Sequence, residues 1–389
     1  MRIAVDATCW HNRRGYGRHA RALLRSLVAL DSTNRYTLFT DSPDPTEPWP
    51  TQAEVRIVPS SAPAVQAASA DGRRSFADMW RMSRALSSPH FDLVLFPTIY
   101  TYVPVFGGAR TLVMVHDVIA ETFPQLTVPR LAARLAWNLK GAIGRWQADA
   151  LITVSDYSRK LILERFGMDR SRVFVVGEAA DPVFRKLENP IPGPNLQRAG
   201  IDGSHRMIAY LGGFSPHKNL EALVRAFGNL AVQSEFSDVR LVMVGDISGD
   251  AFHTYYGTIA AQVTQLGLED RVILTGYLSD DDVVVLLNLA SVLVLPSLME
   301  GFGLPAVEAA ACGCPVIATN ESPLASLLGE GAISIRPREQ EIETALESVF
   351  SSEELSHRMS QSGLAAAHSL TWEAAARQMM AVIEKVVAA

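Results

Sequence analysis

The sequence predicts an α/β protein built from two doubly wound parallel sheets. Three observations lead to this fold class: short apolar runs that alternate with helical periodicities, a proline-rich break near mid-chain, and a second alternation after it. A chain of 389 residues is too long for one ordinary core, so two domains are expected. With 48% hydrophobic and 20% charged residues, the composition excludes a disordered protein.

The first half alternates strand and helix patterns. Its strand candidates are short, continuous and β-branched, as expected of parallel strands that are buried on both faces. They occur at 2–6, 36–40, 55–58, 92–96, 111–116, 150–154 and 173–176. Helical periodicity lies between them at 17–30, about 75–86, 129–146 and 155–166.

A linker is predicted at 188–198, because three prolines and a glycine within 188–195 can continue neither a helix nor a sheet. The alternation then restarts with strands at 207–211, 240–244, 272–275, 292–295, 315–318 and 333–335, and helices near 219–230, 252–266, 280–289, 305–311 and 339–350. The predicted domains are therefore 1–187 and 199–368. A last helix within 369–389 has no following strand, so we expect it to cross back to the first domain.

The two halves differ in charge. Residues 1–187 hold 24 basic and 17 acidic side chains, a net +7, whereas residues 188–389 hold 11 and 24, a net −13. A basic half is expected to meet an anionic partner. Nucleic acid is not expected as that partner, because the sequence shows no basic-aromatic platform and no recognition-helix motif.

Cysteine usage and hydropathy predict the compartment. Cys9, Cys312 and Cys314 are too few for a disulfide framework, which favours a reducing environment. Asp6 interrupts the first apolar run, so no signal peptide is expected. The longest apolar stretch, 283–295, is shorter than the ~20 residues of a membrane span. We expect a cytoplasmic protein that is soluble or peripheral on the inner face of the plasma membrane.

Two strand ends of the first half carry candidate site residues. Gly15 and Gly17 open a helix, where backbone N–H groups can approach an anion, although a plain glycine turn explains them equally well. His116 follows the strand at 111–115 and can serve as a general acid or base, or donate a hydrogen bond to a sugar. By position alone, a satisfied histidine beside a helix-capping Asp117 is the simpler interpretation.

Two strand ends of the second half are more informative. Lys218 follows Gly212 and Gly213 at a helix start, a combination that suits a diphosphate but lacks the Walker spacing. Glu300 lies on a glycine loop and Glu308 one turn into the next helix, where carboxylates can accept paired sugar or ribose hydroxyls. The aspartates at 280–282 follow Ser279 and are interpreted as N-terminal helix residues, so no metal site is predicted.

Taken together, these segments resemble the family-4 retaining glycosyltransferases of the GT-B fold, in which two Rossmann-like domains face a cleft. The resemblance runs through most of the chain, and its most specific element is the Glu-x7-Glu signature. It rests on Gly-Tyr-Gly-Arg at 15–18, His-Asp-Val at 116–118, Val-Ser-x-Tyr-Ser at 154–158, Pro-His-Lys-Asn-Leu at 216–220, Val-Gly-Asp at 244–246 and Pro-Ser-x-x-Glu-Gly-Phe-Gly-Leu-Pro-x-x-Glu at 296–308.

The resemblance implies a role for each matched residue. His116 would contact the donor sugar near the reacting carbon and Glu300 would hold its hydroxyls, so both are catalytic candidates. Lys218 would bind the diphosphate and Glu308 the ribose. The other donor-binding candidates are Gly15, Gly17, Gly213, Phe302, Gly303 and Leu304, and those that frame the base are Val244, Asp246, Tyr277 and Leu278. The first domain would be the acceptor side and the second would bind the donor.

One departure from the family pattern concerns the diphosphate. Gly213 stands where members often carry an arginine, so one cation is missing or is supplied by His217 or Arg18.

The resemblance also implies the reaction: metal-independent transfer of a hexose, with a nucleoside-diphosphate sugar as co-substrate and no cofactor. A GDP-linked mannose or rhamnose is favoured, with a saccharide or lipid-linked saccharide of cell-surface polysaccharide synthesis as acceptor. UDP sugars, a nucleotide-sugar epimerase of the same fold and a catalytically silent donor-binding subunit are the alternatives. Two basic, apolar stretches, 73–84 and 130–146, either bind an anionic membrane or pack on the sheet.

Overall fold

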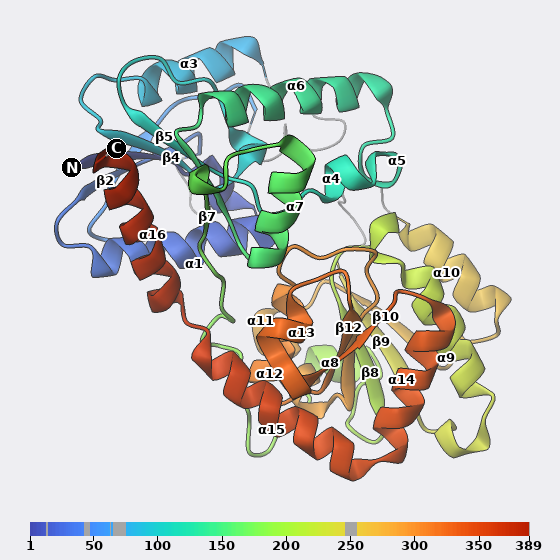
Figure 1. Ribbon diagram of the computed structural model, residues 1–389. Coiled ribbons are helices and arrows are strands. Elements are labelled where there is room, and N and C mark those ends of the chain that lie inside the picture. The colour runs from blue at the N-terminus through green and yellow to red at the C-terminus, as the bar shows by residue number, and fades with distance from the viewer. Residues whose placement is uncertain (13–14, 43–46, 63, 65–74, 246–254, 389) are drawn as a thin grey trace. The chain divides into compact units, whose positions relative to one another are not determined.

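Two units, each with its own parallel sheet, make up the protein (Figure 1). The computed structural model describes residues 1–12, 15–42, 47–62, 64, 75–245 and 255–388. The first unit consists of Met1–Glu178 together with Thr371–Ala389, and the second of Ala179–Leu370. The predicted class of two doubly wound α/β sheets is confirmed.

The first unit is built on a seven-stranded parallel sheet in the order β3-β2-β1-β4-β5-β6-β7. Its strands are β1 (Arg2–Asp6), β2 (Arg35–Thr40), β3 (Glu54–Ile57), β4 (Leu93–Phe96), β5 (Arg110–Met114), β6 (Ala150–Thr153) and β7 (Val173–Val175). Its helices are α1 (Gly15–Leu30), α3 (Phe76–Leu86), α4 (Ile119–Thr122), α5 (Pro124–Thr127), α6 (Leu131–Gln147), α7 (Asp156–Phe166) and α16 (Trp372–Ala388).

The second unit is built on a six-stranded parallel sheet in the order β10-β9-β8-β11-β12-β13. Its strands are β8 (Met207–Leu211), β9 (Arg240–Val244), β10 (Val272–Gly276), β11 (Val292–Leu295), β12 (Val316–Thr319) and β13 (Ala332–Ile335). Its helices are α8 (Pro194–Arg198), α9 (Leu220–Ala231), α10 (Tyr256–Gln265), α11 (Asp280–Leu289), α12 (Leu304–Ala311), α13 (Leu324–Leu328), α14 (Glu339–Ser351) and α15 (Glu353–Ser369).

The predicted linker at 188–198 lies inside the second unit. It contains the short helix α8, whose Leu196 is fully buried. The Asn195 amide of α8 donates a hydrogen bond to Asp282 Oδ2 at 2.9 Å, which ties the segment to α11. The chain leaves the first unit after Glu178, ahead of the predicted boundary at 187, because the segment that follows already packs on the second unit.

The last helix returns to the first unit, where α16 lies beside α1 (red and blue in Figure 1). Its buried face consists of Trp372, Ala375, Ala376, Met379, Val382, Ile383 and Val386. These positions recur at helical spacing, so one apolar stripe of α16 covers α1 while its charged residues remain in water.

Strand order fixes where ligands can bind in each unit. In an open parallel sheet the crevice lies beyond the carboxyl ends of the strands where the order reverses direction. The reversal lies between β1 and β4 in the first sheet, and between β8 and β11 in the second. The loops that follow β8 and β11 contain Lys218 and Glu300, respectively.

Candidate functional site

Lys218 and Glu300 meet at the switch point of the second sheet. Lys218 ends the 3-10 turn at Pro216–Lys218 that follows β8, and Glu300 lies on the loop after β11. Lys218 Nζ donates a hydrogen bond to Glu300 Oε1 at 2.7 Å, and Ser297 Oγ donates to the same oxygen at 2.6 Å. Two predicted site residues are thus in direct contact, although 82 positions separate them in the sequence.

Glu300 holds its charge in a buried position. Its exposed fraction is 7%, and burial by itself would raise the pKa of the carboxyl. The charge of Lys218 and the hydrogen bonds from Lys218 and Ser297 outweigh burial and hold the pKa below its usual value. Glu300 is therefore ionised at neutral pH, and its Oε1 accepts the hydrogen bonds from Lys218 and Ser297.

His217, which was considered as a cation for the predicted diphosphate contact, precedes Lys218 in the 3-10 turn after β8. Burial and the neighbouring Lys218 lower its pKa to about 3, so its imidazole is neutral near pH 7. Its Nδ1 is buried without a hydrogen-bond partner. The expectation that His217 or Arg18 supplies that cation stays a prediction.

Gly303 makes the turn that leads from Glu300 into α12. Its φ is +90°, a conformation that side chains strain, and an added Cβ would lie 2.7 Å from Leu324 Cδ1. Pro305 occupies the first turn of α12, where its missing N–H costs no hydrogen bond. Glu308, 5% exposed, lies one turn further into α12, and Phe302 before the helix is also buried. The N–H groups around Gly303 and Leu304 lie at the positive end of this helix.

Three segments predicted to bind the diphosphate or frame the base lie side by side at the carboxyl ends of β8, β9 and β10. The Gly212 N–H donates to the Val244 carbonyl at 3.0 Å, and the Gly245 N–H donates to the Gly276 carbonyl at 3.1 Å. Gly213 accepts a hydrogen bond from the Tyr210 hydroxyl at 2.7 Å.

The segment after β10 presents one exposed and one buried side chain. Tyr277 is 64% exposed and Leu278 is buried. Asp246, also predicted to frame the base, lies outside the described residues.

In the first unit, Gly15 and Gly17 lie in the first turn of α1. A Cβ on Gly17 would lie 2.1 Å from the Asn12 carbonyl oxygen, whereas one on Gly15 would meet nothing within 4 Å. Gly17 is therefore required by the close approach of the loop, and Gly15 is not.

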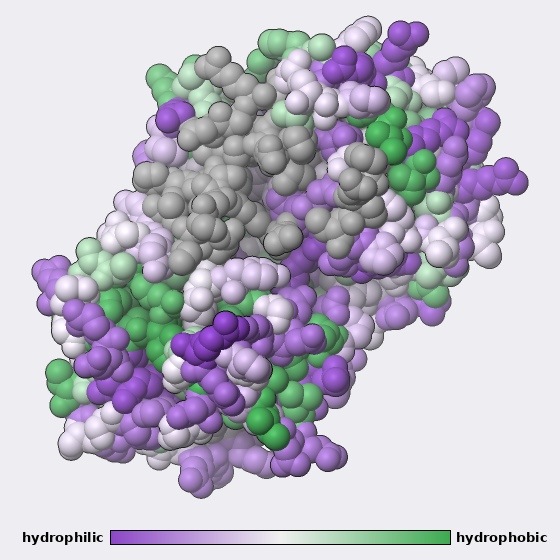
Figure 2. All heavy atoms as spheres, turned by 180° about the vertical axis from the view of Figure 1, so that it is seen from behind, coloured by the Kyte–Doolittle hydropathy of each residue, from purple (hydrophilic) through white to green (hydrophobic). Residues whose placement is uncertain are grey.

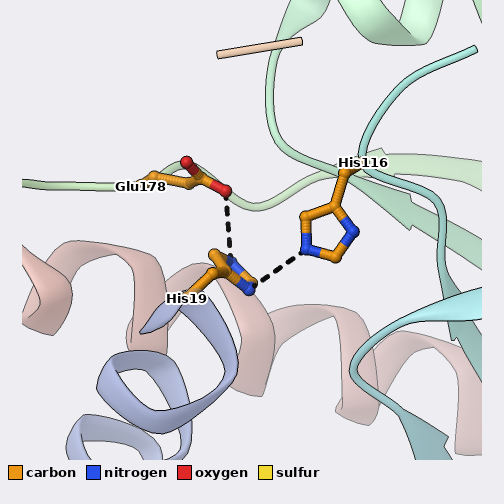
Figure 3. A group of neighbouring side chains, drawn as sticks. All are labelled: His19, His116 and Glu178. Atoms are coloured by element: carbon orange, nitrogen blue, oxygen red, sulfur yellow. Dashed lines mark hydrogen bonds and ion pairs between the residues drawn. The ribbon is translucent and has the colours of Figure 1, made fainter. Parts of the chain in front are cut away.

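His116 follows β5 in the first unit and belongs to a buried cluster that the motifs do not reveal (Figure 3). His116 Nε2 lies 3.4 Å from Nδ1 of His19 in α1, and His19 Nε2 lies 3.8 Å from Oε1 of Glu178 after β7. Burial lowers the pKa of His116 to about 4 and places that of His19 well below its usual value. Both imidazoles are neutral near pH 7.

Two family models match the chain over most of its length. The model described as Glycosyltransferase Family 4 matches residues 13–183, and the model described as Glycosyl transferases group 1 matches residues 195–365. The chain belongs to these glycosyltransferases.

Curated glycosyltransferases from several bacteria are similar to this chain. Mannosylfructose-phosphate synthase of Agrobacterium fabrum is 30% identical over 241 residues, which cover 61% of this chain and 53% of that protein. MMP alpha-(1->4)-mannosyltransferase of Mycolicibacterium hassiacum is 30% identical over 273 residues, covering 66% and 62%. The chain thus spans less than two thirds of the length of these relatives.

Solved structures confirm the GT-B fold of this glycosyltransferase. Sucrose-phosphate synthase of Thermosynechococcus elongatus superposes with a TM-score of 0.78 at 19% identity, over 100% of this chain and 99% of that one. WaaG, a glycosyltransferase of lipopolysaccharide biosynthesis, gives 0.74 at 16% identity over 98% and 99%. HepE of Anabaena, in complex with UDP and glucose, gives 0.72 at 16% identity over 98% and 99%.

Sequence reasoning missed Ser297, His19 and Glu178. Ser297 lies three residues before Glu300 within the signature segment, so its spacing on a tight loop was the available signal. His19 lies on the helix that Gly15 and Gly17 open, two residues beyond Gly17. Glu178 stands two residues beyond the strand predicted at 173–176, a position that the strand-end rule includes but that no motif distinguishes.

Proposed function

We propose that this glycosyltransferase moves a hexose, with mannose or rhamnose favoured, from a GDP-linked sugar to a saccharide or lipid-linked saccharide. The place of this reaction would be cell-surface polysaccharide synthesis. Support comes from relatives named as mannosyltransferases, including the O-antigen chain mannosyltransferase B of Escherichia coli, 25% identical over 266 residues. The MMP alpha-(1->4)-mannosyltransferase supports the same sugar.

The observation that carries the proposal is the contact between Lys218 and Glu300 at the switch point of the second sheet. A cation beside a carboxylate fits a donor that has a diphosphate next to a polyhydroxylated ring. We propose that Lys218 binds the diphosphate, Glu300 the sugar hydroxyls and Glu308 the ribose. The N–H groups of Gly303 and Leu304 would add donors at the start of α12.

Departure of the nucleoside diphosphate is the step that these residues would assist. Negative charge develops on the leaving diphosphate, and Lys218 and the helix start can stabilise it. The sugar acquires oxocarbenium character, and the family resemblance leads us to propose retention of configuration by attack from the face that the diphosphate leaves. The leaving phosphate would accept the proton of the acceptor hydroxyl. We further propose that His116 contacts the sugar, and that neither a metal nor a cofactor takes part.

Nucleotide preference tests the donor. Thermal melting with GDP, UDP and ADP should show stabilisation by one base above the others, because a ligand that binds only the folded state raises the melting temperature. Stabilisation by UDP alone would favour the alternative of a UDP-sugar-dependent transferase. Release of nucleotide from the sugar nucleotide only when acceptor is present would separate transfer from epimerisation and from silent binding.

Glu308→Ala tests the ribose contact. We expect this variant to lose about tenfold or more in affinity for whichever nucleotide stabilises the wild type, because a carboxylate that accepts two hydroxyls contributes charge-assisted hydrogen bonds. Glu269→Ala, at an exposed position of the same unit, should leave the affinity unchanged. An unchanged affinity of Glu308→Ala would contradict the assigned role.

A membrane surface is proposed as a further partner, through α6. Leu131, Leu135, Leu139 and Trp146 are 61–82% exposed and lie along one side of this helix. On the face that Figure 2 shows, hydrophobic residues gather in several groups between hydrophilic ones. Among the described helices, none is long and apolar enough to cross a bilayer.

Three of the basic residues of α6 make contacts within their own unit. Lys140 binds the Tyr100 carbonyl, Arg134 the Val128 carbonyl at 3.3 Å, and Arg145 lies over the Phe166 ring. The exposed stripe of α6 is therefore apolar more than cationic, and we expect adsorption on the inner face of the plasma membrane through insertion of side chains. Of the other basic stretch, residues 73 and 74 lie outside the described residues.

Liposome flotation tests this idea. The wild type should float with anionic vesicles at low salt, and Leu135→Ser/Trp146→Ser should not. A wild type that stays in the soluble fraction would exclude the membrane as a partner.

A further inference from the structure

In the cluster of His19, His116 and Glu178, His19 contacts both of the other residues. Figure 3 shows the His19 ring between the other two side chains, with one nitrogen toward Glu178 and the other toward His116. The two imidazole planes are nearly perpendicular, at 86°, with ring centroids 5.0 Å apart. All three residues belong to the first unit and come from α1, the end of β5 and the segment after β7.

The contacts of the cluster favour one assignment of the protons to the ring nitrogens. A neutral imidazole has one N–H and one lone pair, so a contact between two such rings needs one donor and one acceptor. The Glu178 carboxylate lies close to His19 Nε2, and its negative charge disfavours a lone pair there. At 3.8 Å this contact is too long for a hydrogen bond, and His19 Nε2 has no hydrogen-bond partner among the described residues, so the preference is electrostatic. On that ground we expect His19 to be protonated on Nε2 and to accept at Nδ1, with His116 Nε2 as the donor.

Nδ1 of His116 is then a bare acceptor. This atom is buried and has no hydrogen-bond partner in the described protein. A buried acceptor without a partner costs free energy, so a site that keeps one is ready for a ligand donor. A sugar hydroxyl is a donor of the required kind.

We propose that Glu178 and His19 are positioning residues that fix His116 in the tautomer with a protonated Nε2, so that its Nδ1 accepts a hydrogen bond from a hydroxyl of the bound donor sugar. The part about the sugar rests on the proposed function, whereas the part about the tautomer does not. The surrounding packing supports a fixed arrangement, since the Trp372 ring lies 5.5 Å from that of His19 and Thr153 Oγ1 donates to the His116 carbonyl at 3.3 Å.

The three residues also match the composition of a metal site, since one ligand atom from each lies within 4.8 Å of the others. In the observed geometry, however, His19 turns different nitrogens toward its two neighbours, and a single ion could bind only one of them. An arrangement in which His19 lies between Glu178 and His116 accounts for both contacts. A stoichiometric metal ion in the purified protein that is lost in His19→Gln would overturn the proposed positioning role of Glu178 and His19.

Imidazole nitrogen NMR on the full-length protein labelled with ¹⁵N-histidine tests the tautomer without any substrate. The signals of His116 and His19 are identified by their loss in His116→Gln and His19→Gln. We expect a protonated Nε2 and a bare Nδ1 for His116 in the wild type, and a mixture of tautomers in Glu178→Gln, because an amide can face His19 with either its oxygen or its NH2. A His116 protonated on Nδ1 in the wild type, or an unchanged tautomer in Glu178→Gln, would overturn the proposal.

Kinetics test the link to the sugar. With a series of sugar nucleotides in which single hydroxyls are replaced by hydrogen, one deoxy analogue should lose about threefold to tenfold in kcat/KM in the wild type. That same loss should shrink in Glu178→Gln and vanish in His116→Ala. If the wild type transfers the sugar but no deoxy analogue shows this pattern of losses in kcat/KM, the proposed contact between His116 and the sugar is wrong. If the wild type transfers no sugar at all, the proposed function fails while the NMR result still decides the tautomer.

Asp31→Asn is the matched control for both experiments. Asp31 is a buried carboxylate of the same unit, and its oxygens accept hydrogen bonds from Asn34 and Tyr36 rather than from the cluster. This substitution should leave the His116 tautomer and the analogue pattern unchanged.

Discussion

Glu300 owes its charge in a buried position to Lys218. Breaking such a pair by removing one partner leaves an uncompensated charge, which is more costly than losing both. In Lys218→Met we expect the pKa of Glu300 to rise, and the unfolding free energy at pH 7 to fall by about 3–5 kcal/mol in urea titrations. Lys160→Met, which removes the exposed lysine that lies 3.9 Å from Glu164, should cost less than about 1 kcal/mol.

The double variant Lys218→Met/Glu300→Met completes this test. It removes both charges, so we expect it to recover most of the stability that Lys218→Met loses. A double variant no more stable than Lys218→Met would show that the buried charge is not the cause.

The buried histidines make stability depend on pH. The pKa of His217 is lowered to about 3 and that of His116 to about 4, each below the ordinary 6.5 of an unfolded chain. Below pH 6.5 the unfolded chain therefore binds protons that the folded protein does not. Their full contribution to stability is present above pH 6.5 and is lost as the pH falls toward the folded values, at about 1.4 kcal/mol per pH unit for each histidine.

The dependence of the unfolding free energy on pH between pH 4 and 6 should be less steep in His217→Gln, by about 1.4 kcal/mol per pH unit. Urea unfolding at a series of pH values measures this slope. His357→Gln, an exposed histidine of the same unit, is the control and should leave the slope unchanged. Equal slopes for wild type and His217→Gln would show that His217 is not the buried titrating group.

The sequence placed Lys218 and Glu300 after two strands of the second half, and the structure brings their side chains into contact. Their roles as site residues stay predictions. The cluster of His19, His116 and Glu178 could not be predicted, because its members follow β1, β5 and β7, and only the folded sheet brings these strand ends together. The neutral state of His217 likewise depends on burial, which no local pattern of residues encodes.

At the scale of elements, the turn into α1 depends on one of its two glycines. Gly17→Ala would place a methyl group 2.1 Å from the Asn12 carbonyl oxygen, and backbone cannot move aside cheaply. We expect this variant to lose about 1–3 kcal/mol of unfolding free energy by urea titration. Gly15→Ala meets nothing within 4 Å and should lie within about 0.5 kcal/mol of the wild type. Similar losses in both variants would contradict the steric explanation.

Element boundaries were predictable to different degrees. The strands at 2–6, 207–211 and 292–295 coincide with β1, β8 and β11, because parallel strands buried on both faces are uninterrupted apolar runs. The helix α15 was not predicted. Its buried side includes the small residues Gly363 and Ala367, which make its apolar pattern weak. Gly363 is close to Gly331, and this backbone contact depends on tertiary packing rather than local pattern.

At the scale of the molecule, the first unit depends on a helix encoded after the whole second unit. Ile383 in α16 is fully buried, so Ile383→Ala should cost about 2–5 kcal/mol. The loss should appear as faster amide hydrogen exchange in α1, with exchange in α9 and α14 of the second unit unchanged. The control Glu384→Ala changes an exposed neighbour on the same helix and should leave α1 protected. Equal acceleration in both units would contradict the assignment of α16 to the first.

Fluorescence offers a simple way to observe one unit at a time. The six tryptophans, at positions 10, 49, 80, 137, 146 and 372, all belong to the first unit. Tryptophan emission therefore follows the first unit, whereas circular dichroism follows both. In Ile383→Ala we expect the emission transition to move to lower urea while a second transition in circular dichroism stays in place.

The placement of α16 also has a consequence for synthesis on the ribosome. The segment 179–370 has every strand and helix of its sheet once Leu370 has been made. In the first unit, by contrast, the face of α1 that packs against α16 stays uncovered until residues 371–388 have been synthesised. A stop codon introduced just after Leu370 would therefore leave the second unit intact. The same truncation would remove α16 and destabilise the first unit, although that unit is encoded first.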